Sequence, residues 1–181
     1  MLTRRMCKAL LDDDGGVLGF GAGTTGRVLG TDATERVLGP LVAACEVRGL
    51  AKVVEPAVTC LQKLVSNGHL VGGMTSEGLL VEQTPAARVV AAVVGCGESS
   101  DERLQLAVVK ALLSFVSSPT FRVHGECLLR AVRVIFNLAI GSPFDAIQTA
   151  AAGALQQFLP VVVDRATVAR QEHPNWSSVE V

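Results

Sequence analysis

The sequence predicts an all-α protein built as an armadillo/HEAT-like stacked helical array, an α-α superhelix. Apolar residues recur at helical spacing in several successive segments, and no segment requires the alternation typical of a β-strand. Alanine, valine and leucine dominate the apolar residues while aromatic residues make up only 4%, and these smaller side chains suit close helix packing. One short pattern also recurs at intervals typical of helical repeats.

The recurring pattern is a small residue, then Leu, and after two further positions an apolar pair. It occurs at residues 60–65, 111–116 and 154–159, with offsets of 51 and 43 residues. In armadillo and HEAT arrays each helical unit buries its apolar face by stacking on the next unit. We attribute the longer first interval to a glycine-rich insertion at residues 72–78.

Three domain regions are expected. Residues 1–31 combine a short N-terminal helix with a glycine-rich loop over residues 15–30, because that loop holds too many glycines and threonines for a stable helix. Residues 32–170 form the helical domain, and residues 171–181 form a disordered tail. A chain of 181 residues buries roughly two-thirds of its unfolded surface without metals or disulfides.

The helical domain is expected to begin at residues 32–35, where Glu35 lies three residues after Asp32 as in a capped helix start. Its first apolar stripe contains Val37, Leu41, Ala44 and Cys45. The next helix covers residues 53–65 and ends at residues 66–68, whose Asn-Gly pair is typical of a left-handed C-terminal cap.

A further helix is expected from Thr84-Pro85 to Val94, because proline is favoured at the first helical position. Residues 99–159 then predict three helices in a row. Ser99 stands three residues before Glu102, the spacing of a capping box. The stripe that follows ends at residues 117–119 and consists of Leu104, Val108, Ala111, Leu112 and Phe115.

The second of these helices is expected to end near Gly141 and to bury Leu128, Leu129, Val132, Ile135 and Phe136. The third opens at Ser142, with Ser142 as the cap, Pro143 at the first helical position and Asp145 in the electropositive first turn. Gly153 lies inside this helix, where a stronger helix former would be favoured by about 1 kcal/mol.

Charge and cysteine content exclude several classes of protein. The 16 basic and 17 acidic residues give a net charge of −1, which provides no field to attract nucleic acid or an acidic membrane leaflet. No uninterrupted apolar run is long enough to span a membrane, and charges interrupt the N-terminal segment before a signal peptide could form. The five scattered cysteines are read as small apolar core residues in a reducing, cytoplasmic setting.

No catalytic, cofactor-binding or metal-binding constellation is predicted. Residues 21–26 match Gly-x-Gly-x-x-Gly and Glu46 lies 20 residues beyond, but that motif binds a dinucleotide only between a strand and a helix, and no strand is expected here. His124 and Cys127 share a helix face, yet two ligands are too few for zinc. No cofactor is expected, although a nucleotide-binding enzyme that uses residues 21–26 remains an alternative.

The helical segments resemble one protein family in detail. The resemblance lies in residues 103–113, 117–119, 124–125, 128–133 with Asn137, and 148–151 with Leu155, Gln157 and Leu159, and earlier in residues 60–64 and 69–70. The chain is similar over most of residues 37–165 to the dimerisation and cyclophilin-binding (DCB) domain of the large, brefeldin-A-inhibited Arf guanine-nucleotide exchange factors of the trans-Golgi. Residues 15–30 and 72–78 depart from that pattern.

The resemblance implies a non-catalytic regulatory module. Such a module self-associates, contacts the adjoining helical domain of the exchange factor, and binds an Arf-like GTPase that recruits the factor to trans-Golgi network membranes in vesicle-mediated transport. The exchange-catalysing domain is then absent from this chain, and its membrane association is peripheral and through partners. A generic helical-repeat adaptor with unrelated partners is the alternative. Candidate partner contacts are the polar residues that border the apolar stripes: Arg130, Arg133, Asn137, Gln148 and Thr149.

Overall fold

The computed structural model describes residues 31–47, 49–70, 84–121 and 123–172, and these residues form α-helices with no strand among them. The prediction of an all-α protein is therefore confirmed. The elements are α2 (Thr31–Cys45), α3 (Ala51–Ser66), α4 (Pro85–Gly95), the 3-10 turn η2 (Cys96–Glu98), α5 (Glu102–Ser117), α6 (Gly125–Gly141) and α7 (Asp145–Glu172).

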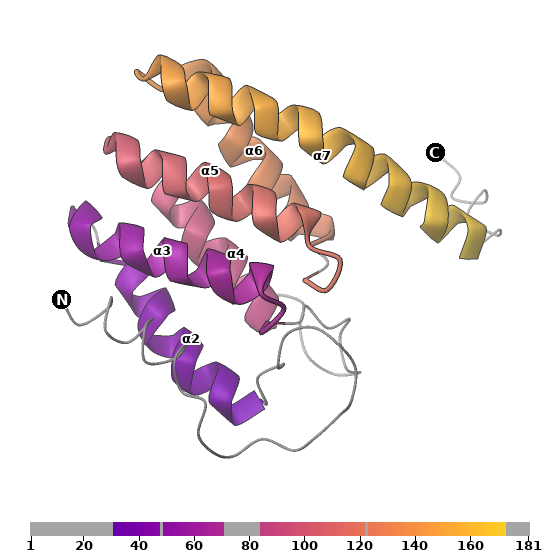
Figure 1. Cartoon of the computed structure of the whole chain (residues 1–181), viewed down its shortest axis with the longest axis horizontal. Helices are drawn as coiled ribbons and strands as arrows, with labels where there is room; N and C mark the ends of the chain where they lie inside the picture. The colour runs from indigo at the N-terminus through magenta and orange to yellow at the C-terminus, as the bar shows by residue number, and fades with distance from the viewer. Residues whose placement is uncertain (1–30, 48, 71–83, 122, 173–181) are drawn as a thin grey trace.

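The helices form two layers of a stacked array. In Figure 1, α3, α5 and α7 lie one above another and form one layer. Helices α2, α4 and α6 form the second layer, which packs against the first. Consecutive helices form the hairpins α2–α3, α4–α5 and α6–α7, and each hairpin packs on the next. The three copies of the recurring sequence pattern fall on α3, α5 and α7, one in each hairpin. The predicted helical array is thus present, and the pattern marks one of its layers.

The core runs continuously between the two layers. Leu38 of α2, Leu61 of α3, Leu112 of α5 and Ile135 of α6 are all fully buried, so each hairpin contributes to one apolar interior. The whole predicted stripe of α5 is buried, which confirms it. At the end of α5, the rings of Phe115 and Phe121 lie 5.3 Å apart between centroids, within the range of favourable aromatic pairs.

Two predicted helix ends are confirmed by their local geometry. Thr84 caps α4 and accepts a hydrogen bond from the backbone N–H of Ala87 at 3.2 Å, with Pro85 in the first helical turn. At the end of α3, Gly68 has a φ of 71°, the left-handed conformation expected of an Asn-Gly cap. The backbone N–H of His69 then bonds the carbonyl oxygen of Leu64 at 2.9 Å.

Two predicted caps are wrong. The residue that caps α5 is Asp101, which accepts from the backbone N–H of Leu104 at 2.9 Å. Ser99 instead accepts from the backbone N–H of Asp101, because the helix begins only at Glu102. Likewise α7 begins at Asp145, so Pro143 precedes the helix, and Ser142 lies at the C-terminal cap position of α6.

The predicted buried stripe of α6 is also wrong in part. The residues that α6 buries are Ala131, Ile135 and Leu138, whereas Leu129 and Phe136 are 59% and 52% exposed. At 100° per residue, Leu129 and Phe136 lie roughly 140° around the helix from the buried line. Apolar residues occupy two faces of α6, and its packing between α4 and α7 selects the other face for the core.

Helix α7 is longer than predicted, and its C-terminal part projects beyond α5 in Figure 1. Its span Asp145–Val168 is long and apolar enough to cross a membrane by length and composition, with a mean hydropathy of 1.3 and 22% of that window buried. One such helix is weak evidence for a membrane span, and α7 packs on the array through Ile147, Ala151 and Phe158. The expectations for residues 1–30, 72–78 and 173–181 lie outside the described residues.

Candidate interaction surface

A groove between α4 and α6 holds three of the five predicted partner contacts. Arg130, Arg133 and Asn137 line it from α6, and their spacing places them along one side of that helix. The groove encloses about 480 Å³. Its other walls are formed by Val94 and Gly95 of α4, Gly97 and Glu98 of η2, and Gln105, Leu138 and Ser142.

The close approach of η2 to α6 shapes this groove. A Cβ atom on Gly97 would lie 2.6 Å from Cγ1 of Val134, closer than such atoms can pack. Gly97 is itself buried, so only a residue without a side chain fits between the two elements. The close approach of η2 to α6 at this groove thus depends on glycine at position 97.

The charges of the groove are partly compensated. Arg130 Nε donates to Oε1 of Glu126 at 3.2 Å, one turn earlier on α6, and both side chains are about half exposed. Such an exposed pair contributes little to stability, so Arg130 can exchange this partner for another carboxylate. Arg133 and Asn137 are exposed, and Glu98 stands on the opposite wall. The groove therefore offers both charge signs to a protein partner.

The other two predicted contacts lie elsewhere. Gln148 Nε2 donates to the carbonyl oxygen of Ser142 at 2.8 Å, which closes the turn that precedes α7. Thr149 Oγ1 donates to the carbonyl oxygen of Asp145 at 2.9 Å within its own helix. Both side chains have local structural partners, and the structure does not bring them together with Arg130, Arg133 and Asn137.

Sequence analysis missed an apolar surface at the last hairpin. We call this surface the end face, and it consists of Leu129, Phe136 and Ile140 on α6 and Leu159 and Val163 on α7. These side chains are 52–67% exposed, and their spacings of seven or four residues align them along each helix. The signal was present in the sequence, because α6 carries more apolar residues than one core-facing stripe requires.

The end face points away from the rest of the array. The side of α6 that lines the groove faces α4. Leu129, Phe136 and Ile140 lie on a different side of the same helix. This is the side on which a further hairpin would stack if the layers continued, although no described helix covers it. Aligned exposed apolar residues of this kind mark a surface for protein association.

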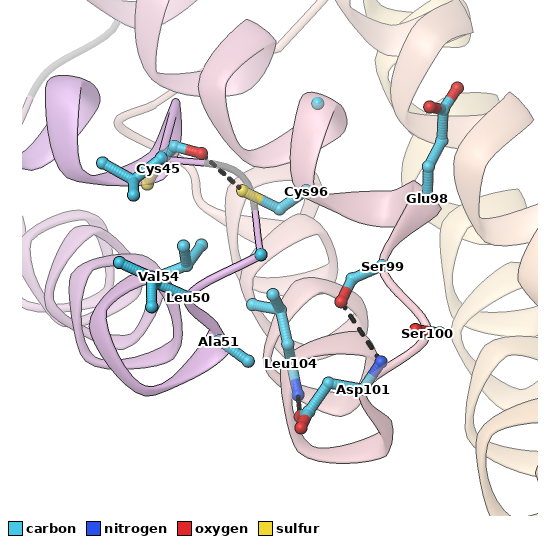
Figure 2. Close-up of a pocket in the computed structure, with 13 residues that line it drawn as sticks. Cys45, Leu50, Ala51, Val54, Cys96, Glu98, Ser99, Ser100, Asp101 and Leu104 are labelled. Atoms are coloured by element: carbon cyan, nitrogen blue, oxygen red, sulfur yellow. Dashed lines mark hydrogen bonds between the residues drawn. The ribbon is translucent and has the colours of Figure 1, made fainter.

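A second cavity adjoins the groove, with which it shares Gly95 and Glu98, and lies between the end of α2, the start of α3, the turn η2 and the start of α5. It encloses about 440 Å³ and is lined by the two buried cysteines Cys45 and Cys96. Figure 2 shows Cys96 Sγ directed at the carbonyl oxygen of Cys45, to which it donates a hydrogen bond of 3.5 Å. Leu50, Ser100 and Asp101 stand at its exposed rim.

The two thiols of this cavity also interact with each other. A hydrogen bond to the Cys96 sulfur raises the pKa of the Cys45 thiol well above its ordinary range, and burial raises it further. The same hydrogen bond lowers the pKa of Cys96, although burial acts in the opposite direction. The two thiols are thus coupled, and Cys96 Sγ also donates to the carbonyl oxygens of Cys45 and Ala92.

No group of three or more metal-ligating side chains occurs among the residues that the structure places. His124 lies at the N-terminal cap position of α6 and is exposed, and Cys127 is half-buried in the first turn of the same helix. Cys45, Cys60 and Cys96 are buried and form no disulfide within the described residues, as the sequence predicted for core cysteines. The glycine motif of residues 21–26 lies outside the described part of the chain.

The fold and its surfaces define the class of protein. Stacked helical hairpins with an exposed apolar end face and a charged groove are typical of helical-repeat modules that bind other proteins. A family model described as Mon2/Sec7/BIG1-like, dimerisation and cyclophilin-binding domain (DCB) matches residues 27–170. The chain belongs to this DCB family.

Curated relatives support the same family. Brefeldin A-inhibited guanine nucleotide-exchange protein 2 of Arabidopsis thaliana is 37% identical over 132 residues, which are 73% of this chain and 7% of the relative. Brefeldin A-inhibited guanine nucleotide-exchange protein 1 of Homo sapiens is 33% identical over 132 residues, 70% of this chain and 7% of the relative. Brefeldin A-inhibited guanine nucleotide-exchange protein 1 of Arabidopsis thaliana is 36% identical over 140 residues, which are 76% of this chain and 8% of the relative. The chain thus spans about 7–8% of the length of these relatives.

Proposed function

We propose that this chain acts as a regulatory module of a large Arf guanine-nucleotide exchange factor. In this role it self-associates and contacts the adjoining helical domain of the factor. It also binds an Arf-like GTPase, which recruits the factor to trans-Golgi network membranes during vesicle-mediated protein transport. Its setting would be the cytoplasmic side of those membranes. The support is the DCB family match together with relatives named as brefeldin A-inhibited guanine nucleotide-exchange proteins.

The end face is the observation that carries the proposal of self-association. Three apolar side chains of α6 and two of α7 lie more than half exposed, although α6 and α7 have well-buried cores on their other sides. Burial of apolar surface stabilises by roughly 25 cal/mol per Å². A second copy, or a helical hairpin of the adjoining domain, would remove this surface from water at little cost in polar groups.

Self-association can be tested by light scattering coupled to size-exclusion chromatography over a range of protein concentrations. We expect the mass of the purified chain to rise from the 18.9 kDa of one chain towards twice that value. The double variant Phe136→Glu/Ile140→Glu should remain monomeric, because it places two carboxylates in the end face. Leu50→Glu is the matched control, since Leu50 is 55% exposed but lies at the other end of the array.

Each outcome of that experiment is informative. A wild-type chain that stays monomeric at all concentrations contradicts self-association. A double variant that still dimerises contradicts the end face as its site while leaving self-association intact. Loss of the dimer in Leu50→Glu would move the interface to the start of α3.

GTPase binding is tested by capture of the chain on an immobilised Arf-like GTPase loaded with GTP or with GDP. We expect retention by the GTP form, and weaker retention of Arg130→Ala/Arg133→Ala if the groove of α6 contributes. The matched control is Arg103→Ala, an exposed arginine on α5 that does not line the groove. Equal behaviour of both nucleotide forms would contradict recruitment by an active GTPase.

We also infer that the chain does not catalyse nucleotide exchange by itself. The support is that its match falls on the DCB domain and covers about 7% of the related exchange proteins. Fluorescent-nucleotide release from an Arf GTPase should therefore proceed at the same rate with and without the chain. Accelerated release would contradict this assignment.

A further inference from the structure

Cys45 and Cys96 come from two different hairpins and meet at the wall of one cavity. Cys45 is the last residue of α2, and Cys96 is the first residue of η2, directly after α4. They are 8% and 6% exposed. Cys96 Sγ lies 3.5 Å from the carbonyl oxygen of Cys45 (Figure 2). It also lies 3.2 Å from the carbonyl oxygen of Ala92, so its position is held from both helices.

The cavity gives a small reagent access to these sulfur atoms. Its volume of about 440 Å³ is far larger than the roughly 30 Å³ that a water molecule occupies in the liquid. Exposed residues form its rim, and Ser99, Ser100 and Asp101 provide polar groups beside its apolar wall. A hydroperoxide therefore fits the cavity in size and polarity.

Both cysteines line the same cavity, so one thiol can react with a reagent there and the other can resolve the product. Interaction with Cys45 lowers the pKa of Cys96, although burial acts in the opposite direction. Thiolates are the nucleophiles of cysteine oxidation, and a second thiol in contact can resolve the product. Cys60 is buried on α3 and does not line the cavity.

We infer that Cys45 and Cys96 form an oxidation site, in which a small hydroperoxide entering the cavity converts the two thiols into an intramolecular disulfide. The Cys96 thiolate attacks one peroxide oxygen, the O–O bond breaks, and the departing hydroxide takes up a proton to leave as water. The Cys45 sulfur then loses its proton and attacks the sulfenic acid, releasing a second water. Two thiols are oxidised by two electrons and one hydrogen peroxide is reduced to two waters.

The product would tie the end of α2 to the end of α4. Cys45 and Cys96 are 51 residues apart in the sequence, so the bond would close a long loop and connect the first hairpin to the second. Closure of a long loop restricts the unfolded chain and raises stability when the native geometry accepts the bond. The end face lies outside this loop, whereas Val94 and Gly95, which line the groove of α6, lie at its end next to Cys96.

The test uses the purified chain and hydrogen peroxide. After treatment under native conditions, remaining thiols are blocked with N-ethylmaleimide in denaturant and the chain is digested with trypsin without reduction. Cleavage after lysine and arginine leaves each cysteine in its own peptide, with Cys45 in residues 37–48 and Cys96 in residues 89–103. We expect a linked pair of these two peptides, lighter than their sum by two hydrogen atoms.

Variants and a stability measurement make the result specific. Cys45→Ser and Cys96→Ser should abolish the linked pair, and Cys60→Ser, which removes another buried thiol, should retain it. Oxidised wild-type chain should unfold at a temperature about 5–10 °C higher than reduced chain, and dithiothreitol should reverse the shift.

Three results would overturn the inference. The first is the absence of the linked pair from oxidised wild-type chain. This result does not depend on whether any variant folds. The second is oxidation of Cys45 and Cys96 to separate sulfinic or sulfonic acids. The third is a linked pair that contains Cys60 or Cys127 in equal yield, because this would report oxidation of an opened chain.

Discussion

Gln105 and Ser142 hydrogen-bond to each other inside the array, although they lie 37 residues apart in the sequence. Ser142 Oγ donates to Oε1 of Gln105 at 2.8 Å, and Gln105 Nε2 donates to the carbonyl oxygen of Ser99 at 2.7 Å. Both side chains are about 5% exposed or less. One amide thus connects the segment before α5 with the corner between α6 and α7.

We expect Gln105→Leu to lower the free energy of unfolding by about 1–3 kcal/mol, because it leaves the Ser142 hydroxyl and the Ser99 carbonyl without this partner. Urea unfolding measures the change. Gln157→Leu is the matched control, because Gln157 is an exposed residue of α7. Equal effects of the two variants would show that the buried amide contributes nothing specific.

The cap of α5 is tested by comparing Asp101→Ala with Ser99→Ala. Asp101 accepts from a helix N–H that has no partner within the helix, so its loss should cost about 1 kcal/mol. Ser99 accepts from the backbone of Asp101 in an exposed turn, and its loss should cost less. Thermal unfolding of both variants shows which substitution costs more stability. A larger loss for Ser99→Ala than for Asp101→Ala would restore Ser99 as the cap.

Two phenylalanines offer a comparison of burial with the same substitution. Phe115→Ala should cost about 3–5 kcal/mol, because the ring is fully buried against Phe121 and its loss leaves a cavity. Phe136 is 52% exposed, and Phe136→Ala should cost less than about 1 kcal/mol in the monomer. Chemical unfolding at low protein concentration measures both. A large loss for Phe136 in the monomer would contradict its placement on the end face.

Two glycines should respond to alanine with opposite signs. Gly153 lies within α7 with no atom within 4 Å of an added Cβ, so Gly153→Ala should stabilise by about 0.5–1 kcal/mol. Gly68 also has open space, but its φ of 71° is left-handed, and Gly68→Ala should destabilise by about 1 kcal/mol. Unfolding midpoints of the two variants on opposite sides of wild type would support both assignments, and a shared direction would contradict one.

Much of the fold was predictable because its signals are local. The Thr84-Pro85 start, the Asn-Gly end of α3 and the buried stripe of α5 each depend on residues within a few turns of one helix. The recurring pattern extended this local information to the whole array, because it marks one helix of every hairpin. Cap positions were less certain, since Ser99 and Asp101 both offer an oxygen before α5.

The surfaces were less predictable because tertiary packing selects them. Leu129 and Phe136 have the spacing of core residues, and only the position of α4 and α7 shows that they face outward. The contact between Cys45 and Cys96 joins residues of two hairpins, and no local pattern reports it. Arg130, Arg133 and Asn137 met in one groove because they share a helix, whereas Gln148 belongs to the next element.

The stacking of hairpins in chain order has a consequence for how the molecule opens. The middle hairpin, α4–α5, packs on both of its neighbours, so its helices keep some packing contacts until both flanking hairpins have separated. Deuterium exchange should therefore be slowest at the amides of α5 and faster at those of α2 and the projecting part of α7. Fraying would proceed inward from both extremities, and a protease would reach the central helices last.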